Sequence, residues 1–165
     1  METNITMGKD SQKITPFLWF NGNVEEALNL YTSVFKNAKI TGVRRMGDPK
    51  TGKIFTASFE LEGLEFMALD GGPHYTFTPA VSFFVKCTTQ EEVDDLWNKL
   101  TADGGKESRC GWLVDKFGVS LQIIPNNLGE LLGDPDPAKA QHVMQAMMAM
   151  GKIDIKGLEE AYNKH

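Results

Sequence analysis

The feature of this chain that most constrains its fold is an internal repeat. The segment Glu25–Tyr31 matches Glu91–Trp97, because each begins with two glutamates and an apolar residue and ends with Leu and an aromatic residue. These segments are 66 positions apart, whereas Gly63 and Gly118, each just before the last strand signal of its half, are 55 positions apart. A repeated order of signals indicates two copies of one supersecondary unit.

The first copy carries the signals of a strand, a helix and three further strands. Asn23 is a suitable helix-capping residue, and the glutamates after it suit the first turn of a helix. The later segments alternate apolar and polar residues and are separated by turns that contain Gly. We expect a strand at Ile14–Phe20, a helix at Val24–Phe35 and strands at Lys39–Arg45, Lys53–Leu61 and Leu64–Leu69, the last two forming a hairpin.

The second copy repeats this order with a shorter middle. Thr88 or Thr89 begins its helix, and Pro125 ends its last strand. We expect a strand at Ala80–Lys86, a helix at Glu91–Leu100 and strands at Lys106–Cys110, Gly111–Val114 and Val119–Ile124. The sequence therefore predicts the α+β class, with two βαβββ modules folded back around a shared hollow.

The chain divides into three parts on this interpretation. Residues 14–72 form the first module, 73–125 the second and 126–165 a C-terminal helical extension, after a loose polar leader at Met1–Lys13. The extension carries two helices, Ala138–Met150 and Ile155–Tyr162. The first has an apolar side rich in methionine, which is typical of packing against a core; it consists of Val143, Met144, Met147, Met148 and Met150. The extension must cover an edge, the mouth of the barrel or a partner subunit.

Composition excludes several kinds of partner. The formal net charge of −5 and the pI near 5.2 argue against a nucleic-acid-binding protein, which needs a basic surface. The apolar runs are far too short to cross a membrane, and Met1–Asp10 lacks the apolar core of a signal peptide. Cys87 and Cys110 lack the paired spacing of a zinc site, so we expect two reduced thiols in a cytoplasmic protein.

Several motifs resemble a known family. They are Ile14–Asn23, Cys110–Leu113, Asp115–Gly118, Gln122–Pro125 and Met150–Ile155. With the βαβββ repeat, they resemble the vicinal oxygen chelate superfamily, which includes glyoxalases, extradiol dioxygenases and bleomycin-resistance proteins. More narrowly, they resemble its branch labelled 3-demethylubiquinone-9 3-methyltransferase. The resemblance implies a glyoxalase/bleomycin-resistance-type open barrel with C-terminal helices added.

The resemblance also implies where a metal would lie. In the superfamily, the first and last strands of each module supply His and Glu ligands to one divalent ion. The matching positions here are Thr15 or Pro16, Ala80, Met67 and Gln122, none of which is His, Asp or Glu. We therefore predict no metal and no other cofactor. We expect the three histidines, His74, His142 and His165, on the surface.

Strand alternation predicts which side chains line the hollow. If Thr15 points inward, so do Phe17 and Trp19, and if Ala80 points inward, so do Ser82 and Phe84. The predicted ligand-pocket residues are Phe17, Trp19, Met67, Ser82, Phe84, Cys110, Trp112 and Gln122. Aromatic side chains with sparse polar groups are the usual lining of a small-molecule site. The alternative is that these side chains fill a small barrel as its core.

Three functions remain open. The first, which we favour, is metal-independent binding of an aromatic or amphipathic small molecule by a homodimer, as in bleomycin-resistance proteins. The second is a superfamily enzyme, such as an isomerase, lyase or dioxygenase, with an atypical site. The third is the methyltransferase of the branch label, although Gly71-Gly72 leads into Pro73 and another strand, and not into the helix that a Gly-rich S-adenosylmethionine turn requires.

Overall fold

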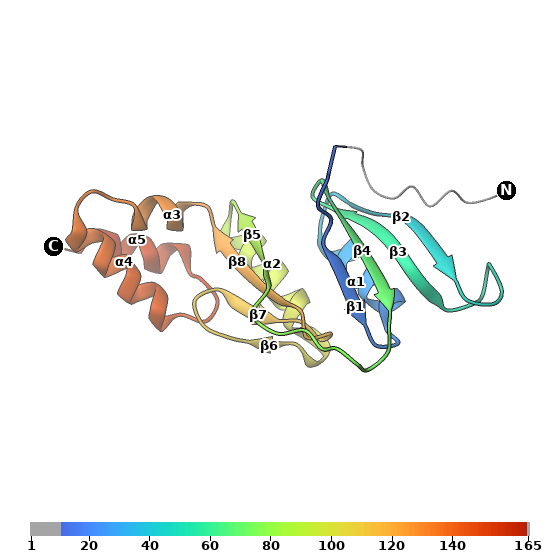
Figure 1. Cartoon of the computed structure of the whole chain (residues 1–165). Coiled ribbons are helices and arrows are strands. Elements are labelled where there is room, and N and C mark those ends of the chain that lie inside the picture. The colour runs from blue at the N-terminus through green and yellow to red at the C-terminus, as the bar shows by residue number, and fades with distance from the viewer. Residues whose placement is uncertain (1–10, 165) are drawn as a thin grey trace. The chain divides into compact units, whose positions relative to one another are not determined.

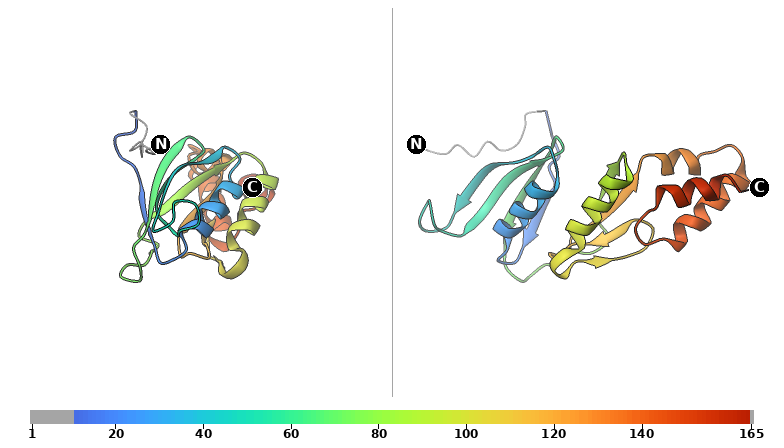
Figure 2. Two further views of the ribbon diagram at one scale, coloured as in Figure 1. Left: turned by 90° about the vertical axis from the view of Figure 1, so that its right-hand side faces the viewer. Right: turned by 180° about the vertical axis from the view of Figure 1, so that it is seen from behind.

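The computed structural model describes residues 11–164 and divides the chain into two compact units, Met1–Thr76 and Phe77–His165 (Figures 1 and 2). Each unit contains a four-stranded sheet with a helix on one face. The division lies four residues after the expected end of the first module, and the C-terminal helices belong to the second unit. Most of the expected leader at Met1–Lys13 lies outside the described residues.

The first unit is a βαβββ module. Its elements are β1 (Phe17–Phe20), α1 (Val24–Val34), β2 (Ala38–Arg45), β3 (Ile54–Leu61) and β4 (Leu64–Asp70). The strand order is β1-β4-β3-β2, with β1 parallel to β4 and the other neighbours antiparallel. The turn at Glu62-Gly63 has φ values of 49° and 86°, as a two-residue hairpin turn requires. The predicted hairpin is therefore confirmed.

Helix α1 and one face of the first sheet form the core of this unit (Figure 1). The Tyr31 ring stacks on Phe59 with centroids 6.3 Å apart, and Phe59 stacks on Phe66 at 5.3 Å. Phe59 and Phe66 are almost fully buried. Side chains alternate along a strand, so the sequence neighbours of Phe59 and Phe66 point to the other face of the sheet. We call that face, which carries Ser58 on β3 and Met67 on β4, the first open face.

The second unit repeats the module and adds three helices. Its elements are β5 (Ser82–Cys87), α2 (Gln90–Thr101), a short 3₁₀ turn η1 (Ala102–Gly104), β6 (Lys106–Glu107), β7 (Trp112–Val114), β8 (Ser120–Pro125), α3 (Asn127–Leu132), α4 (Pro137–Ala149) and α5 (Ile155–Tyr162). The strand order β5-β8-β7-β6, with β5 parallel to β8, reproduces that of the first sheet. The predicted βαβββ repeat is therefore confirmed. The face opposite α2 is called the second open face.

The C-terminal helices cover the end of β8. Ile124, Leu128 and Val143 form a buried cluster with Ile153 and Leu158. The segment before α5 is tied to the module, because Cys110 N–H donates to Met150 O at 2.9 Å. Helix α3 was not predicted from the sequence. No helix among residues 11–164 is long and apolar enough to span a membrane.

Four local expectations were wrong. Met144 and Met148 are 42% and 59% exposed, so the methionine side of α4 packs only in part. Asn23 occupies the cap position of α1, but its side chain accepts no capping hydrogen bond, whereas Thr89 Oγ1 accepts one from Glu92 N–H at 3.2 Å. The expected strand at Lys106–Cys110 ends at Glu107, and the chain then turns through Cys110, whose φ of 57° is left-handed. The strands expected from Ile14 and from Ala80 begin only at Phe17 and Ser82.

Candidate functional site

The first open face carries three of the predicted pocket residues. Phe17 pairs with Met67 on β4, and Met67 pairs with Ser58 on β3. Phe17 is 50% exposed, Met67 is half-buried and Ser58 is buried. The Ser58 hydroxyl is buried and accepts a hydrogen bond from Thr41 Oγ1 at 2.8 Å. The more exposed part of this row, at Phe17 and Met67, is therefore apolar.

Trp19, the third residue on this face, is held in place by the segment after β4. Its indole N–H donates to Gly72 O at 2.9 Å, and the Tyr75 ring meets it edge-on with centroids 5.0 Å apart. Gly71 lies directly against the indole, since an added Cβ there would lie 2.6 Å from Cδ2. Trp19 thus has a defined structural role in the first unit.

The second open face carries four more predicted residues. Gln122 on β8 lies between Phe84 on β5 and Trp112 on β7, with which it is in register. Phe84 is 56% exposed, and Trp112 and Gln122 are half-buried. Gln122 Nε2 donates to Ser82 Oγ at 2.9 Å, so the amide has a fixed orientation. This face combines two aromatic side chains with an oriented polar pair.

The two faces correspond position by position. Phe17 pairs with Met67, and Phe84 pairs in the same way with Gln122. Met67 and Gln122 are 55 positions apart, as are Gly63 and Gly118. The first-strand metal positions implied by the resemblance, Thr15 or Pro16 and Ala80, precede β1 and β5. The first-strand residues in register with Met67 and Gln122 are instead the two exposed phenylalanines, Phe17 and Phe84.

Cys110 lies apart from the paired strands of this face. It occupies the turn before β7, and its backbone is bound to the segment before α5. Its place among the pocket residues stays a prediction. Both cysteines are free thiols in the structure. Burial, followed by the nearby negative charge of Glu92, raises the pKa of the Cys87 thiol to about 12, so Cys87 has the character of a buried apolar residue.

Metal-binding side chains do not cluster in the part of the chain that the structure describes. No three of His, Cys, Asp and Glu within residues 11–164 are placed to hold an ion. His74 is exposed, as predicted. His142 is half-buried, with a buried Nδ1 that has no hydrogen-bond partner, so its expected surface position is only partly right. His165 lies outside the described residues.

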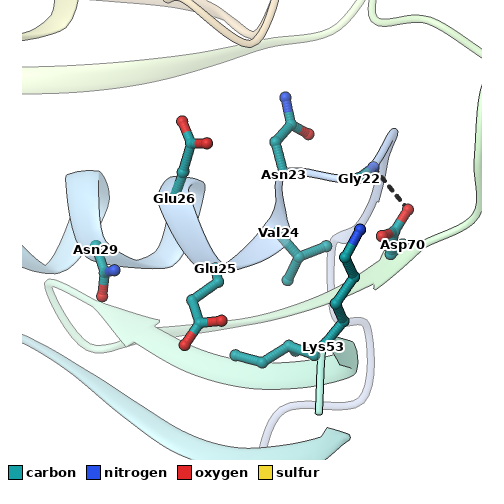
Figure 3. Close-up of a pocket in the computed structure, with 9 residues that line it drawn as sticks. Gly22, Asn23, Val24, Glu25, Glu26, Asn29, Lys53 and Asp70 are labelled. Carbon is teal, nitrogen blue, oxygen red and sulfur yellow. Dashed lines mark hydrogen bonds between the residues drawn. The ribbon is translucent and has the colours of Figure 1, made fainter. Parts of the chain in front are cut away.

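A polar pocket that the sequence did not indicate lies at the start of α1 (Figure 3). Its volume is about 260 Å³, and Gly22 N–H donates to Asp70 Oδ1 at 2.7 Å at one end. Figure 3 shows the Lys53 side chain extending toward this end. The lining residues are Gly22, Asn23, Val24, Glu25, Glu26, Asn29, Lys53, Ile54 and Asp70. A helix N-terminus favours anions, but carboxylates outnumber the ammonium group among these residues, so the pocket does not suit an anion.

Two buried polar residues occupy equivalent positions on the open faces. Glu65 is 4% exposed on β4, and Ser120 is 1% exposed on β8, two residues before Met67 and Gln122. Gln12 contacts the Glu65 backbone, donating from Nε2 to Glu65 O at 2.9 Å and accepting from Glu65 N–H at 3.0 Å. Strand alternation places both residues on these faces, but it could not predict that they are buried.

The two βαβββ modules define the class of this protein: it has a glyoxalase/bleomycin-resistance-type fold. The chain belongs to the 3-demethylubiquinone-9 3-methyltransferase family, whose model matches residues 12–124. This confirms the family resemblance of the sequence motifs. A comparison with curated proteins finds no match.

Several solved structures are similar to this chain. The PhnB protein from Bacillus cereus, which carries the same methyltransferase name, is 40% identical over 69% of this chain and 99% of its own, with a TM-score of 0.64. Protein PA1353 from Pseudomonas aeruginosa is 23% identical over 70% of this chain and 98% of its own, with a TM-score of 0.59. The fosfomycin resistance protein FosX from Listeria monocytogenes, solved with Mn(II) and sulfate, is 17% identical over 74% of this chain and 98% of its own, with a TM-score of 0.49.

Proposed function

We propose that this chain is a small-molecule-binding protein that acts without a metal, with its ligand on the open faces of its sheets. The carrying observation is that Phe17 and Phe84 occupy equivalent positions and are 50% and 56% exposed. An aromatic residue used only as core would be buried. A large exposed aromatic side chain in both copies of a repeat therefore favours a role in binding an apolar ligand.

The polar groups near these rings suit the same role. Binding sites for small molecules combine apolar walls with a few oriented polar groups. On the second open face, Ser82 fixes the Gln122 amide between Phe84 and Trp112. On the first, Met67 occupies the corresponding position. Each face by itself offers apolar contact, and the second also offers one polar contact point.

The experiment is a fluorescence titration with the uncharged aromatic probe N-phenyl-1-naphthylamine. Replacement of Phe84 or Phe17 by Ala should weaken probe binding about fivefold to thirtyfold, since each removes roughly 1–2 kcal/mol of apolar contact. Met148→Ala on α4 is the matched control, because Met148 is also an exposed apolar residue but lies in the C-terminal extension. Equal losses in all three variants, or no binding by the original protein, would contradict the proposal.

Metal independence is tested separately. Probe affinity should be unchanged after dialysis against a chelator, and elemental analysis of the purified protein should find metal well below one ion per chain. A stoichiometric metal whose removal abolishes a measured activity would instead favour a superfamily enzyme, such as an isomerase, lyase or dioxygenase.

Methyl transfer is a second candidate, favoured by the name of the family and of its Bacillus cereus member. Each described sheet has only one parallel strand pair, and Gly71-Gly72 follows β4 without opening a helix. These features differ from the strand–turn–helix site at which S-adenosylmethionine and dinucleotides are commonly bound. Calorimetry with S-adenosylmethionine decides the matter, because saturable heat would support methyl transfer and its absence would remove this candidate.

We further propose that the protein acts in the cytoplasm as a homodimer. Two free thiols suit a reducing compartment. The exposed side chains of Met144 and Met148 offer an apolar surface on α4 that a second copy could cover.

A further inference from the structure

We infer that the second unit alone recognises the polar group of the ligand, and that the ligand is an uncharged aromatic compound with a hydrogen-bond donor beside an acceptor on one edge. This inference rests on the proposed function. It depends on one difference between the two copies of the module, on the orientation of one amide and on the spacing of two aromatic side chains.

The difference between the copies lies at the centre of each open face. Met67 in the first unit corresponds to Gln122 in the second, since both pair with the exposed phenylalanine of the neighbouring parallel strand. A thioether is a weak acceptor and donates nothing, whereas a carboxamide offers both a donor and an acceptor. Polar recognition can therefore arise at this position in the second unit and not in the first.

The orientation of the amide determines what the ligand must offer. Gln122 Nε2 donates to Ser82 Oγ at 2.9 Å, which leaves Gln122 Oε1 as an acceptor and the Ser82 hydroxyl hydrogen as a donor. Within residues 11–164, neither group makes a further hydrogen bond. A ligand that satisfies both groups needs its own donor next to its own acceptor. A cyclic amide fused to an aromatic ring has this edge.

The aromatic side chains determine the shape. Phe84, Gln122 and Trp112 stand on three adjacent strands in one row, so the outer two are about 10 Å apart, twice the strand spacing. A planar ring about 3.5 Å thick fits between two aromatic walls at this separation and lies above the amide. The row itself contains no charged residue, so it provides no partner for an ionised ligand.

The test uses 1(2H)-isoquinolinone, an uncharged cyclic amide, and its N-methyl derivative, which lacks the donor. Affinities for the full-length protein are measured by chemical-shift titration. The parent compound should bind about tenfold more tightly than the derivative, because the derivative leaves Gln122 Oε1 unpaired. In Gln122→Met, which introduces the residue found at the equivalent Met67, the two compounds should bind with about equal affinity. Ser82→Ala, which frees the amide to rotate, should reduce the preference in the same direction.

The outcomes separate this inference from the proposed function. If both compounds bind and Phe84→Ala weakens both, but Gln122→Met leaves their ratio unchanged, the inference is overturned while the binding function stands. If neither compound nor the naphthylamine probe binds, both are overturned. Loss of the preference in Gln122→Met, with retention in Met67→Ala, supports the inference and assigns polar recognition to the second unit.

Discussion

Replacement of Gly71 by Ala tests how the segment after β4 holds Trp19. An added Cβ would lie 2.6 Å from Trp19 Cδ2 and closer still to two other ring atoms. The φ of Gly71 is not left-handed, so the backbone itself accepts Ala, and the three atoms nearest the added Cβ all belong to the indole. The ring must move, and its N–H bond to Gly72 O must lengthen or break.

The expected cost follows from these two changes. Overpacking by one methyl group costs about 1–3 kcal/mol, and loss of one hydrogen bond about 1 kcal/mol. The lower entropy of the unfolded Ala chain offsets roughly 0.5–1 kcal/mol. Gly71→Ala should therefore destabilise the first unit by about 2 kcal/mol. This corresponds to a decrease of about 1 M in the urea midpoint for a typical small protein.

The assay is urea unfolding monitored by circular dichroism, with two comparisons. Gly129→Ala in α3 is the matched control, because an added Cβ there meets nothing within 4 Å and Ala favours a helix. In a Trp19→Ala background, Gly71→Ala should cost less than about 0.5 kcal/mol, since the clashing ring is gone. An equal cost in both backgrounds would refute the reasoning, as would a Gly71→Ala protein as stable as the original.

Three further predictions concern α2, the thiols and the assembly. Thr89→Ala should lower the free energy of unfolding by about 1 kcal/mol, whereas Asn23→Ala should have a much smaller effect because the Asn23 side chain makes no capping hydrogen bond. Equal losses of unfolding free energy in the two variants, measured by urea denaturation, would contradict this. At pH 8 a thiol reagent should modify Cys110 and spare the buried Cys87, and rapid modification of both thiols would be inconsistent with that burial. The free energy of unfolding should decline as pH rises from 9 toward 12, because the unfolded chain loses the Cys87 proton at a lower pH than the folded chain does. Light scattering at micromolar concentration should give a dimer mass, and Met148→Glu should increase the monomer fraction; a monomer for the unaltered protein would exclude the proposed homodimer.

The order of elements could be predicted because each element depends on a local sequence pattern, and the patterns of the βαβββ module occur twice in the chain. Helix α1 was expected from apolar residues spaced by three and four, and it ends one residue before its predicted end. Helix α5 was predicted with its observed bounds at Ile155–Tyr162. Strands β3 and β4 were fixed by alternation and by the turn at Glu62-Gly63. Such patterns extend over only a few neighbouring residues, so these helices and strands could be predicted without knowledge of any tertiary contact.

Features that depend on tertiary contacts were not predictable. Helix α3 has six residues and only Leu128 fully buried, so its apolar pattern is too short to distinguish it from a loop. Asn23 and Thr89 are both good capping residues, yet only Thr89 takes the extended backbone, with ψ 161°, that brings its hydroxyl to Glu92 N–H; Asn23 has ψ 24°. The polar pocket beside Asn23 also needs Lys53 and Asp70, which only the folded sheet brings to α1.

The register of the first strands shows why the site needed the structure. The helices of the two copies are 66 positions apart, but the strand residues that occupy equivalent places, Phe17 and Phe84, are 67 apart. The additional position arises because three residues lie between β1 and α1, and two between β5 and α2. An offset carried over from the helices would align Leu18, which faces the core, with Phe84. Since a one-residue slip moves a side chain to the other face of a sheet, only the observed pairing shows that both copies expose a phenylalanine beside the central residue of the last strand.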